Sequence, residues 1–418
     1  MESSRRITAD WAVTNISRLV TLEPNTGMGP LGVIERGVVV ARDGRIVWVG
    51  PEDALAAQVD LSGAQIMDAG GRAVLPGFVD SHTHFVFAGD RAEEFQLRHA
   101  GVSYEDLARQ GRGILSTVRA TRAASDDELA DLAYARLLSF AAHGTTTVEG
   151  KTGYGLDTET EARCLALMNA LAEKPGLPAV VPTFLGAHTV PPEFRSSPDD
   201  RARYVGLVVE EMLPAFAGKA RFCDVFCEAT AFTVEETRRI LERARDLGYL
   251  LKLHANQLGP SGGARLAAEL GATSADHLDF ASDEELDALH QANVTATLLP
   301  GCSFSLSTPY PAAKRFYDHG LRVALATDFN PGTSYCESIQ MMIALAVSAM
   351  GMTLDEAITA ATLGGAWALG MQDDVGSFAP GKRCDLIVLT GPDERELAYH
   401  FGVNLVARTI IGAQEVAK

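Results

Sequence analysis

The stretch that decides the fold is PGFVDSHTH, residues 76–84, in which two histidines follow a short apolar segment. Side chains alternate along an extended chain, so His82 and His84 point to the same face. Two imidazoles that converge in this way provide half of a transition-metal site. The Pro76-Gly77 turn marks where a new element begins. The stretch therefore predicts a strand that carries a metal site at its carboxyl end.

Further segments of strand length follow this stretch, and helical patterns separate most of them. The predicted strands are residues 74–84, 145–150, 179–186, 222–228, 249–256, 274–278, 294–299 and 322–328. Helices between them are predicted to begin with a capping box, in which a Ser or Thr and a Glu three residues later satisfy free backbone N–H groups. The pairs are Ser125 with Glu128, Thr158 with Glu161, Thr233 with Glu236, Ser282 with Glu285, and Thr353 with Glu356.

Strands that alternate with helices predict a parallel sheet with right-handed crossovers. Eight such units over about 300 residues favour an α/β fold with a (β/α)8 TIM-like barrel over an open sheet. We place this barrel at residues 76–375. The two chain ends are β-rich instead, with predicted strands at residues 12–22, 37–42, 45–50 and 385–390. We expect residues 1–75 and 376–418 to form one small β-sandwich, because two separate modules would each have little core.

The composition is that of an acidic globular protein. Of 418 residues, 47% are apolar and 22% are charged, and the formal net charge is −18. This charge disfavours nucleic acid and anionic membranes as partners. No apolar run reaches the roughly 18–20 residues of a membrane span, and the N-terminal residues do not resemble a secretory signal. The six cysteines form no C-x-x-C pair, which predicts reduced thiols and a cytoplasmic location.

Polar side chains lie at the ends of three more predicted barrel strands, where His254, His277 and Asp328 stand. Active sites of such barrels gather at the carboxyl ends of the strands. We therefore expect these three residues to join His82 and His84. Five other histidines are expected on the surface or in structural roles, namely His99, His143, His290, His319 and His400.

These strand ends, together with the tail GSFAPGKRCDL at residues 376–386, resemble the amidohydrolase superfamily of metal-dependent hydrolases over essentially the whole chain. Within it, longer runs are similar to the imidazolonepropionase family. They are HTHFVFAGDRAEEF (82–95), KTGYGLD (151–157), TFLGAHTVP (183–191), LKLHANQ (251–257), ADHLDF (275–280) and ATDFNPGT (326–333). The resemblance implies a homodimer that hydrolyses the cyclic amide C–N bond of 4-imidazolone-5-propanoate to N-formimidoyl-L-glutamate in histidine degradation.

The resemblance also implies roles for individual residues. One Zn or Fe ion is implied at His82, His84, His254 and Asp328. The implied substrate-binding residues are Arg91, Tyr154, His188, Gln257, Asn330, Gly332 and Thr333. The family can have Glu in place of Gln257, and because Gln cannot take a proton we assign this residue to binding.

Hydrolysis of a cyclic amide needs a nucleophilic water near pH 7, which a metal with an open coordination position supplies. His277 is expected to orient the water or to polarise the carbonyl group, and Asp328 to pass a proton to the leaving nitrogen. Arg91 is expected to bind the propionate as a guanidinium–carboxylate pair. Tyr154, in a mobile loop between two glycines, is expected to fold over the substrate.

Lys252 lies two residues before His254 and is expected to face the barrel interior, where a buried ammonium needs a partner. We expect that partner to be Asp80 or Glu228. Residues 222–228 contain no lysine to bridge two metals, which predicts a single metal ion. Two alternatives stay open. The chain could be another amidohydrolase, such as a deaminase of a nucleobase or a related ring, or a catalytically silent relative.

Overall fold

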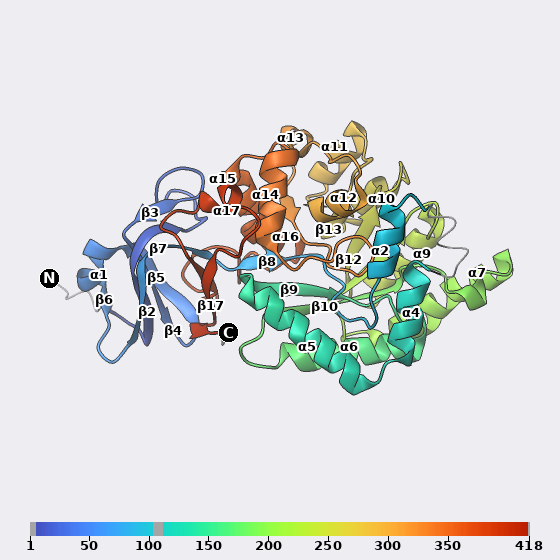
Figure 1. Cartoon of the computed structure of the whole chain (residues 1–418), viewed down its shortest axis with the longest axis horizontal. Coiled ribbons are helices and arrows are strands. Elements are labelled where there is room, and N and C mark those ends of the chain that lie inside the picture. The colour runs from blue at the N-terminus through green and yellow to red at the C-terminus, as the bar shows by residue number, and fades with distance from the viewer. Residues whose placement is uncertain (1–5, 103–111, 417–418) are drawn as a thin grey trace.

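The computed structural model describes residues 6–102 and 112–416 of the chain. It has two parts, a barrel of parallel strands covered by helices and a β domain beside it (Figure 1). The blue N-terminal strands and the red C-terminal strands lie together in the β domain. The described part of the chain contains no helix that is long and apolar enough to cross a membrane.

Within the described residues, the barrel has eight strands, each hydrogen-bonded in parallel to the next along the chain. They are β8 (Phe78–Asp80), β9 (Thr145–Lys151), β10 (Ala179–Ala187), β11 (Phe222–Cys227), β12 (Leu250–Ala255), β13 (Ser274–His277), β14 (Thr295–Leu298) and β15 (Val323–Leu325). Beyond β8 and β15 a parallel bridge joins Thr83 to Phe329. Thr327 also donates two hydrogen bonds to Asp80, from its N–H and its hydroxyl. The predicted (β/α)8 barrel is confirmed.

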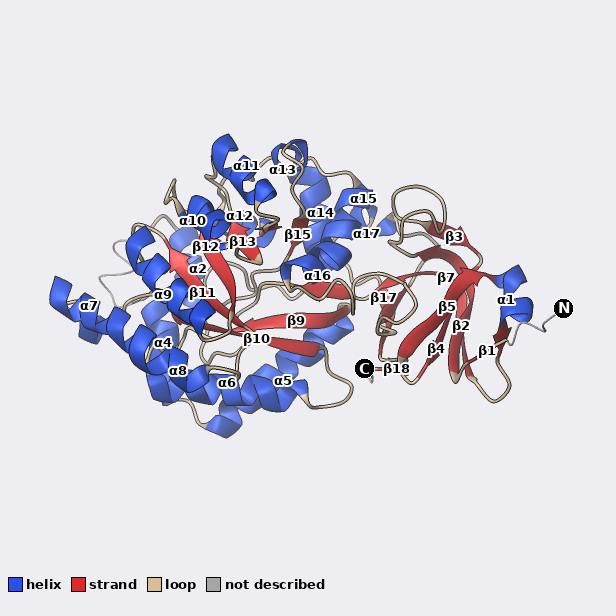
Figure 2. Cartoon of the chain, turned by 180° about the vertical axis from the view of Figure 1, so that it is seen from behind, coloured by secondary structure: helices blue, strands red, loops and turns tan. Residues whose placement is uncertain are grey.

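Helices cover the outside of the barrel strands (Figure 2). They are α2 (Ala92–His99), α4 (Ile114–Ala123), α5 (Asp126–Ala142), α6 (Thr158–Ala172), α7 (Pro198–Leu207), α8 (Leu213–Phe216), α9 (Val234–Asp246), α10 (Gly263–Leu270), α11 (Asp283–Gln291), α12 (Pro300–Leu306), α13 (Ala313–Asp318), α14 (Ile339–Ala349), α15 (Leu354–Thr359) and α16 (Gly365–Ala368). Apolar residues of most of these helices and of the strands form one large core, while α12 and α16 pack in two smaller clusters. This core holds the strand ends in place around the barrel mouth.

The β domain contains a sheet with the strand order β18-β17-β16-β7-β2-β4-β5, and β3 pairs with β2. Its strands are β2 (Trp11–Val20), β3 (Val33–Glu35), β4 (Gly37–Arg42), β5 (Arg45–Pro51), β7 (Gln65–Pro76), β16 (Leu386–Leu389), β17 (Val406–Ile411) and β18 (Gln414–Glu415). Strand β16 pairs antiparallel with β7, so both chain ends build one domain, as the sequence predicts. Residues 1–5 and 417–418 of the expected domain lie outside the described residues.

The sequence prediction misses several smaller elements. They are β3, the first half of β7, β17, β18, α1 (Glu52–Gln58), α17 (Glu396–Tyr399) and the short pair β1 (Ile7–Thr8) and β6 (Val59–Asp60). The predicted strand at residues 74–84 is in fact two strands, because β7 ends at Pro76 in the β domain and β8 begins at Phe78 in the barrel. His82 and His84 therefore lie just beyond β8, in extended chain that the Thr83 bridge holds.

Three of the predicted capping boxes are present, at Thr233, Ser282 and Thr353. Ser125 accepts the N–H of Glu128, but α5 lacks the reciprocal bond of a full capping box. The prediction at Thr158 is wrong, because the side chain of Asp157 caps α6. The carboxylate of Glu161 turns away from the helix end and binds backbone N–H groups of the preceding loop instead.

We expect Thr233→Ala to lower the free energy of unfolding by about 1 kcal/mol, because the N–H of Glu236 loses its acceptor. Thr158→Ala is the matched control, since the Thr158 hydroxyl bonds Glu211 at the surface and caps no helix. Its effect should stay within about 0.5 kcal/mol. Urea unfolding followed by circular dichroism measures both changes. Equal losses in the two variants would contradict the assigned caps.

Candidate active site

The five residues expected at the metal site come together at the carboxyl end of the barrel strands. Their rings and carboxylate are buried, with 0–4% of each residue exposed. Asp328 Oδ1 lies 3.5 Å from His82 Nε2 and 3.8 Å from His84 Nε2. The ring centroid of His254 lies 4.5 Å from that of His82 and 5.4 Å from that of His277. The structure therefore brings together the five residues that the sequence analysis expected at this rim.

Two residues of the cluster have a backbone conformation that residues other than glycine rarely adopt. The φ angles of His277 and Asp328 are 78° and 51°, in the left-handed region. Such a conformation costs about 1–3 kcal/mol and persists where the surroundings enforce it, commonly at active sites. Both residues belong to the cluster, His277 beside His82 and Asp328.

The side chains of the cluster fit a metal ion. Ligand atoms of His82, His84 and His254 lie within 4.8 Å of one another, and so do those of His82, His277 and Asp328. Burial lowers the pKa of His82, His84 and His277 well below its usual value, so these imidazoles are neutral, as metal ligands must be. Among the described residues, the buried His82 Nε2 has no hydrogen-bond partner. A cation satisfies this set of facing acceptors.

Carboxylates behind the cluster hold two of its histidines. Asp276 Oδ2 lies 2.7 Å from His82 Nδ1, and Asp224 Oδ2 lies 2.9 Å from His254 Nδ1. A carboxylate on the second ring nitrogen fixes the tautomer and the ring orientation of a metal-ligating histidine. Burial alone would raise the pKa of Asp224, but His254 and Lys151 lower it, so this carboxylate stays ionised.

Two buried lysines neutralise these carboxylates. Lys151 Nζ lies 2.7 Å from Asp224, 2.9 Å from Glu149 and 3.5 Å from Asp276. Lys252 faces the interior as expected, with Nζ 3.2 Å from Glu149 and 3.8 Å from Asp276. All five side chains of this network are fully buried. The lysines thus counterbalance the negative charge that orients His82 and His254.

The prediction that Lys252 pairs with Asp80 or Glu228 is wrong. Asp80 accepts two hydrogen bonds from Thr327, and Glu228 accepts the N–H groups of Gln257 and Leu258. Lys252 instead pairs with Glu149, a residue at a position on β9 that the sequence analysis did not consider, and donates to Ser81 O at 2.8 Å.

Tyr154 and His188 lie beside the cluster of four histidines and Asp328, next to His84. The His188 ring stacks on the His84 ring at 5.0 Å and 15°, and the Tyr154 ring lies 5.4 Å from the His188 ring. Tyr154 is buried and His188 is partly buried, and desolvation lowers the pKa of His188 to about 3. His188 is therefore neutral, and its Nδ1 lies 3.1 Å from Gly153 O. The loop that carries Tyr154 makes several hydrogen bonds to the buried carboxylate of Glu161.

The loop after β15 carries three of the expected substrate-binding residues. Asn330 Oδ1 accepts the N–H groups of Gly332 and Thr333, and Asn330 Nδ2 donates to Asp328 O and to the Thr333 hydroxyl. The Asn330 side chain is therefore used to shape this loop. The Thr333 hydroxyl lies 3.3 Å from Asp328 Oδ2. Gln257, on the loop after β12, donates from Nε2 to Cys302 Sγ.

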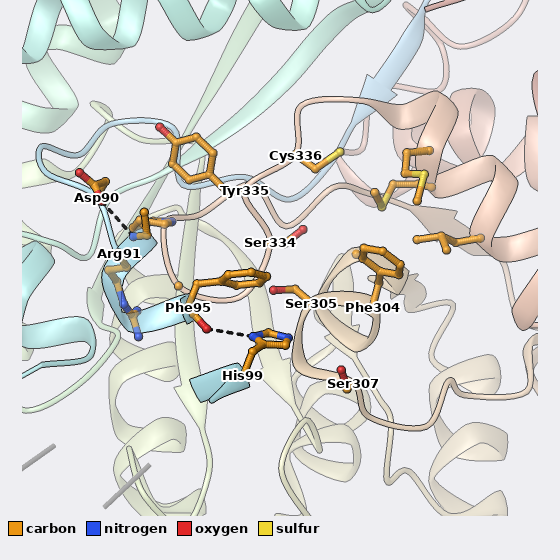
Figure 3. A pocket seen from close by; sticks show the side chains of 17 residues that line it. Asp90, Arg91, Phe95, His99, Phe304, Ser305, Ser307, Ser334, Tyr335 and Cys336 are labelled. Atoms are coloured by element: carbon orange, nitrogen blue, oxygen red, sulfur yellow. Dashed lines mark hydrogen bonds between the residues drawn. The ribbon is translucent and has the colours of Figure 1, made fainter. Parts of the chain in front are cut away.

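Arg91 lies at the start of α2 and binds Glu94 through Nε and Nη2. Its Nη1 faces Gly332, where an added Cβ would lie only 2.1 Å away, so a side chain at Gly332 would displace the guanidinium. Arg91 also lines an apolar cavity of about 800 Å³ between α2, α12 and α14 (Figure 3). None of the five metal-cluster residues lines this cavity. Arg91 and Gly332 thus lie against each other on the lining of this cavity.

The sequence analysis missed the charged network below the cluster. Its members Glu149, Lys151, Asp224 and Asp276 lie on buried barrel strands. Charged residues two positions apart, as in Glu149-Gly150-Lys151 and Lys252-Leu253-His254, were the available signal. On a strand with two buried faces, such a pair shares one face and requires partners on neighbouring strands.

Comparisons with known proteins agree with this architecture. The sequence model of the Amidohydrolase family matches residues 73–416. An imidazolonepropionase from Symbiobacterium thermophilum is 50% identical over 410 residues, 96% of each chain. Another from Clostridium tetani is 46% identical, over 95% of this chain and 96% of its own.

Solved structures share the fold at low sequence identity. A zinc-bound adenosine deaminase from Xanthomonas campestris has a TM-score of 0.71 and 19% identity, over 98% of this chain and 93% of its own. A guanine deaminase from Escherichia coli has a TM-score of 0.67 and 16% identity, over 97% of this chain and 99% of its own. The curated relatives are far more similar in sequence. The chain therefore belongs to the amidohydrolase family and, within it, to the imidazolonepropionases.

Proposed function

We propose that this chain hydrolyses 4-imidazolone-5-propanoate to N-formimidoyl-L-glutamate in histidine degradation. The observation that carries this proposal is the identity of 50% with an imidazolonepropionase over 96% of both chains. The deaminases share only the fold, at 16–19% identity, so this comparison does not favour deamination.

One metal ion, Zn or Fe, belongs at His82, His84, His254 and Asp328. Histidine and carboxylate ligands suit both metals. The orphaned His82 Nε2 and the neutral imidazoles support this assignment. When bound, the metal supplies Lewis acidity, which makes a water molecule nucleophilic near neutral pH.

The protein side chains position the reacting groups around that site. The water oxygen adds to the ring carbonyl carbon, the C–N bond breaks, and the leaving nitrogen gains a proton. Asp328 is the proposed proton carrier, and burial raises its pKa to about 7. His277, neutral and beside both His82 and Asp328, orients the water or polarises the carbonyl oxygen.

The substrate-binding roles rest on position. Arg91 pairs with the propionate, and Tyr154 and His188 pack on the ring beside His84. Gln257 and Thr333 bond its polar atoms, and Asn330 and Gly332 shape the loop that carries Thr333. An anionic substrate that binds to an acidic protein needs a local cation, and Arg91 provides it.

The proposal extends to the domain boundaries, the oligomeric state and the location of the protein. The division at residues 75/76 and 375/376 separates the barrel from the β domain. We also propose a homodimer that binds neither nucleic acid nor membrane, in the cytoplasm. The six cysteines are free thiols, five of them buried, which agrees with a reducing compartment.

The proposed reaction is tested with purified protein and 4-imidazolone-5-propanoate. Ring opening yields N-formimidoyl-L-glutamate, which mass spectrometry detects as the substrate plus one water. A deaminase would release ammonia from an aminated ring and leave that ring closed. Turnover of guanine or adenosine, without turnover of the imidazolone, would refute the proposal.

We expect purified protein to contain about one equivalent of metal per chain. The cluster offers one set of histidine ligands, and Lys151, the lysine at the end of β9, is fully engaged with three carboxylates and cannot bridge a second ion. Elemental analysis of protein reconstituted with Zn or Fe measures the ratio. Two equivalents, both required for turnover, would contradict a mononuclear site.

A further inference from the structure

Glu161 is a buried carboxylate whose partners are backbone amides. It lies in the first turn of α6 with 0% of its surface exposed. Its Oε1 accepts the N–H groups of Gly155 at 2.8 Å and Leu156 at 2.9 Å, and its Oε2 accepts that of Gly153 at 3.1 Å. Burial raises the pKa of Glu161, although Thr152 and these amides favour the charged form. One carboxylate thus organises three amides of a five-residue segment.

The segment at residues 152–156 is shaped around this carboxylate. Gly153 has a φ of 105° and Leu156 a φ of 56°, both in the left-handed region. A Cβ at Gly155 would lie 2.8 Å from Glu161 Oε1, and one at Gly153 would lie 2.8 Å from Leu185 O. The chain therefore approaches the carboxylate more closely than a side chain allows, and hydrogen bonds compensate the strain at Leu156.

This segment carries groups that reach the active site. Tyr154 stands between two of the bonded amides, and its ring lies 5.9 Å from the ring of His84. Gly153 O lies 3.1 Å from His188 Nδ1, so the same segment also fixes the tautomer of His188. Among the described residues, the Glu161 side chain makes no hydrogen bond to the five cluster residues or to the proposed substrate-binding side chains; its bonds to residues 153–156 go to backbone N–H groups.

We propose that Glu161 is a positioning residue for ring opening, because its carboxylate holds residues 152–156 so that Tyr154 and His188 face the substrate. The inference rests on the proposed function. A carboxylate accepts all three amides, whereas a glutamine side chain has one oxygen and turns an N–H group toward backbone N–H groups. The Glu161→Gln variant keeps an oxygen at the Oε1 position, which also lies 3.2 Å from the Gly153 N–H, but it loses the Oε2 bond to Gly153 and places a buried amide donor beside that N–H group.

The first experiment compares Glu161→Gln with Glu159→Gln, an exposed residue on the same helical turn with the same change of charge. We expect Glu161→Gln to raise KM roughly tenfold, the effect of one unsatisfied buried group. The change in kcat should be smaller, and the metal content should not change. Amide hydrogen exchange of the peptide that contains residues 152–156 should accelerate. Glu159→Gln should match the native protein in all four measurements.

A double-mutant cycle separates positioning from general stability. If Glu161 acts through Tyr154, Glu161→Gln should raise KM less than about threefold in a Tyr154→Ala background. The full tenfold effect in that background, or unchanged amide exchange, overturns the proposal. If Glu161→Gln does not fold, Glu161→Asp replaces it, and failure of both to fold assigns Glu161 to stability and also overturns the proposal. A native protein without ring-opening activity refutes the proposed function instead, while amide exchange still tests the anchoring.

Discussion

Replacement of His277 with alanine is expected to lower kcat by about 10²- to 10⁴-fold, the contribution typical of a positioned acid–base group. His277 is neutral, since burial lowers its pKa well below the usual value, and its ring lies 5.5 Å from that of His82. The backbone at this position is left-handed, with a φ of 78°. We therefore expect the bound metal to stay, held by the remaining histidines and Asp328.

Steady-state kinetics and elemental analysis of the same preparation test this expectation. His400→Ala, at an exposed histidine outside the barrel mouth, is the control and should change neither quantity. Loss of metal together with kcat would make His277 a ligand. The close approach of His277, His82 and Asp328 shows where such a ligand set would form.

The barrel could be predicted because its signal is repeated. Buried parallel strands are apolar throughout, and helices with polar first turns separate them, so errors at single boundaries do not change the order of elements. The metal cluster followed from the same regularity, since residues at the carboxyl ends of such strands share one rim. His82 and His84 kept their common face even though β8 ends at Asp80, because Thr83 still pairs with Phe329.

Contacts between strands distant in the sequence could not be predicted. The partner of Lys252 is Glu149 on β9, three strands away around the barrel. Strand periodicity predicts which face a side chain lies on, but not which residue of another strand it contacts. Glu161 shows a second limit. Its spacing from Thr158 fits a capping box, but a carboxylate that can accept three amides of a buried loop binds there instead.

Replacement of Arg91 with alanine is expected to raise KM by the equivalent of about 2–5 kcal/mol, if a desolvated ion pair with the propionate is lost. The propionate is remote from the reacting ring, so the pair exists in both ground and transition states and affects kcat less. The structure adds that Glu94 occupies Nε and Nη2 of Arg91. We therefore expect the edge at Nη1, beside Gly332, to be the part that meets the substrate.

The direct test is a double-mutant-type cycle, in which the native enzyme and Arg91→Ala are each compared on the substrate and on an analogue. An analogue without the carboxylate should bind the native enzyme weakly, but removal of the carboxylate should cost little more once Arg91 is alanine, because both changes remove one contact. Arg36→Ala, at an arginine exposed in the β domain, controls for the change in net charge and should leave KM unchanged. Metal content should be the same in all variants. If Arg91→Ala still discriminates against the uncharged analogue as strongly as the native enzyme, Arg91 does not bind the propionate. The cation for this anionic substrate must then come from another residue at the barrel mouth.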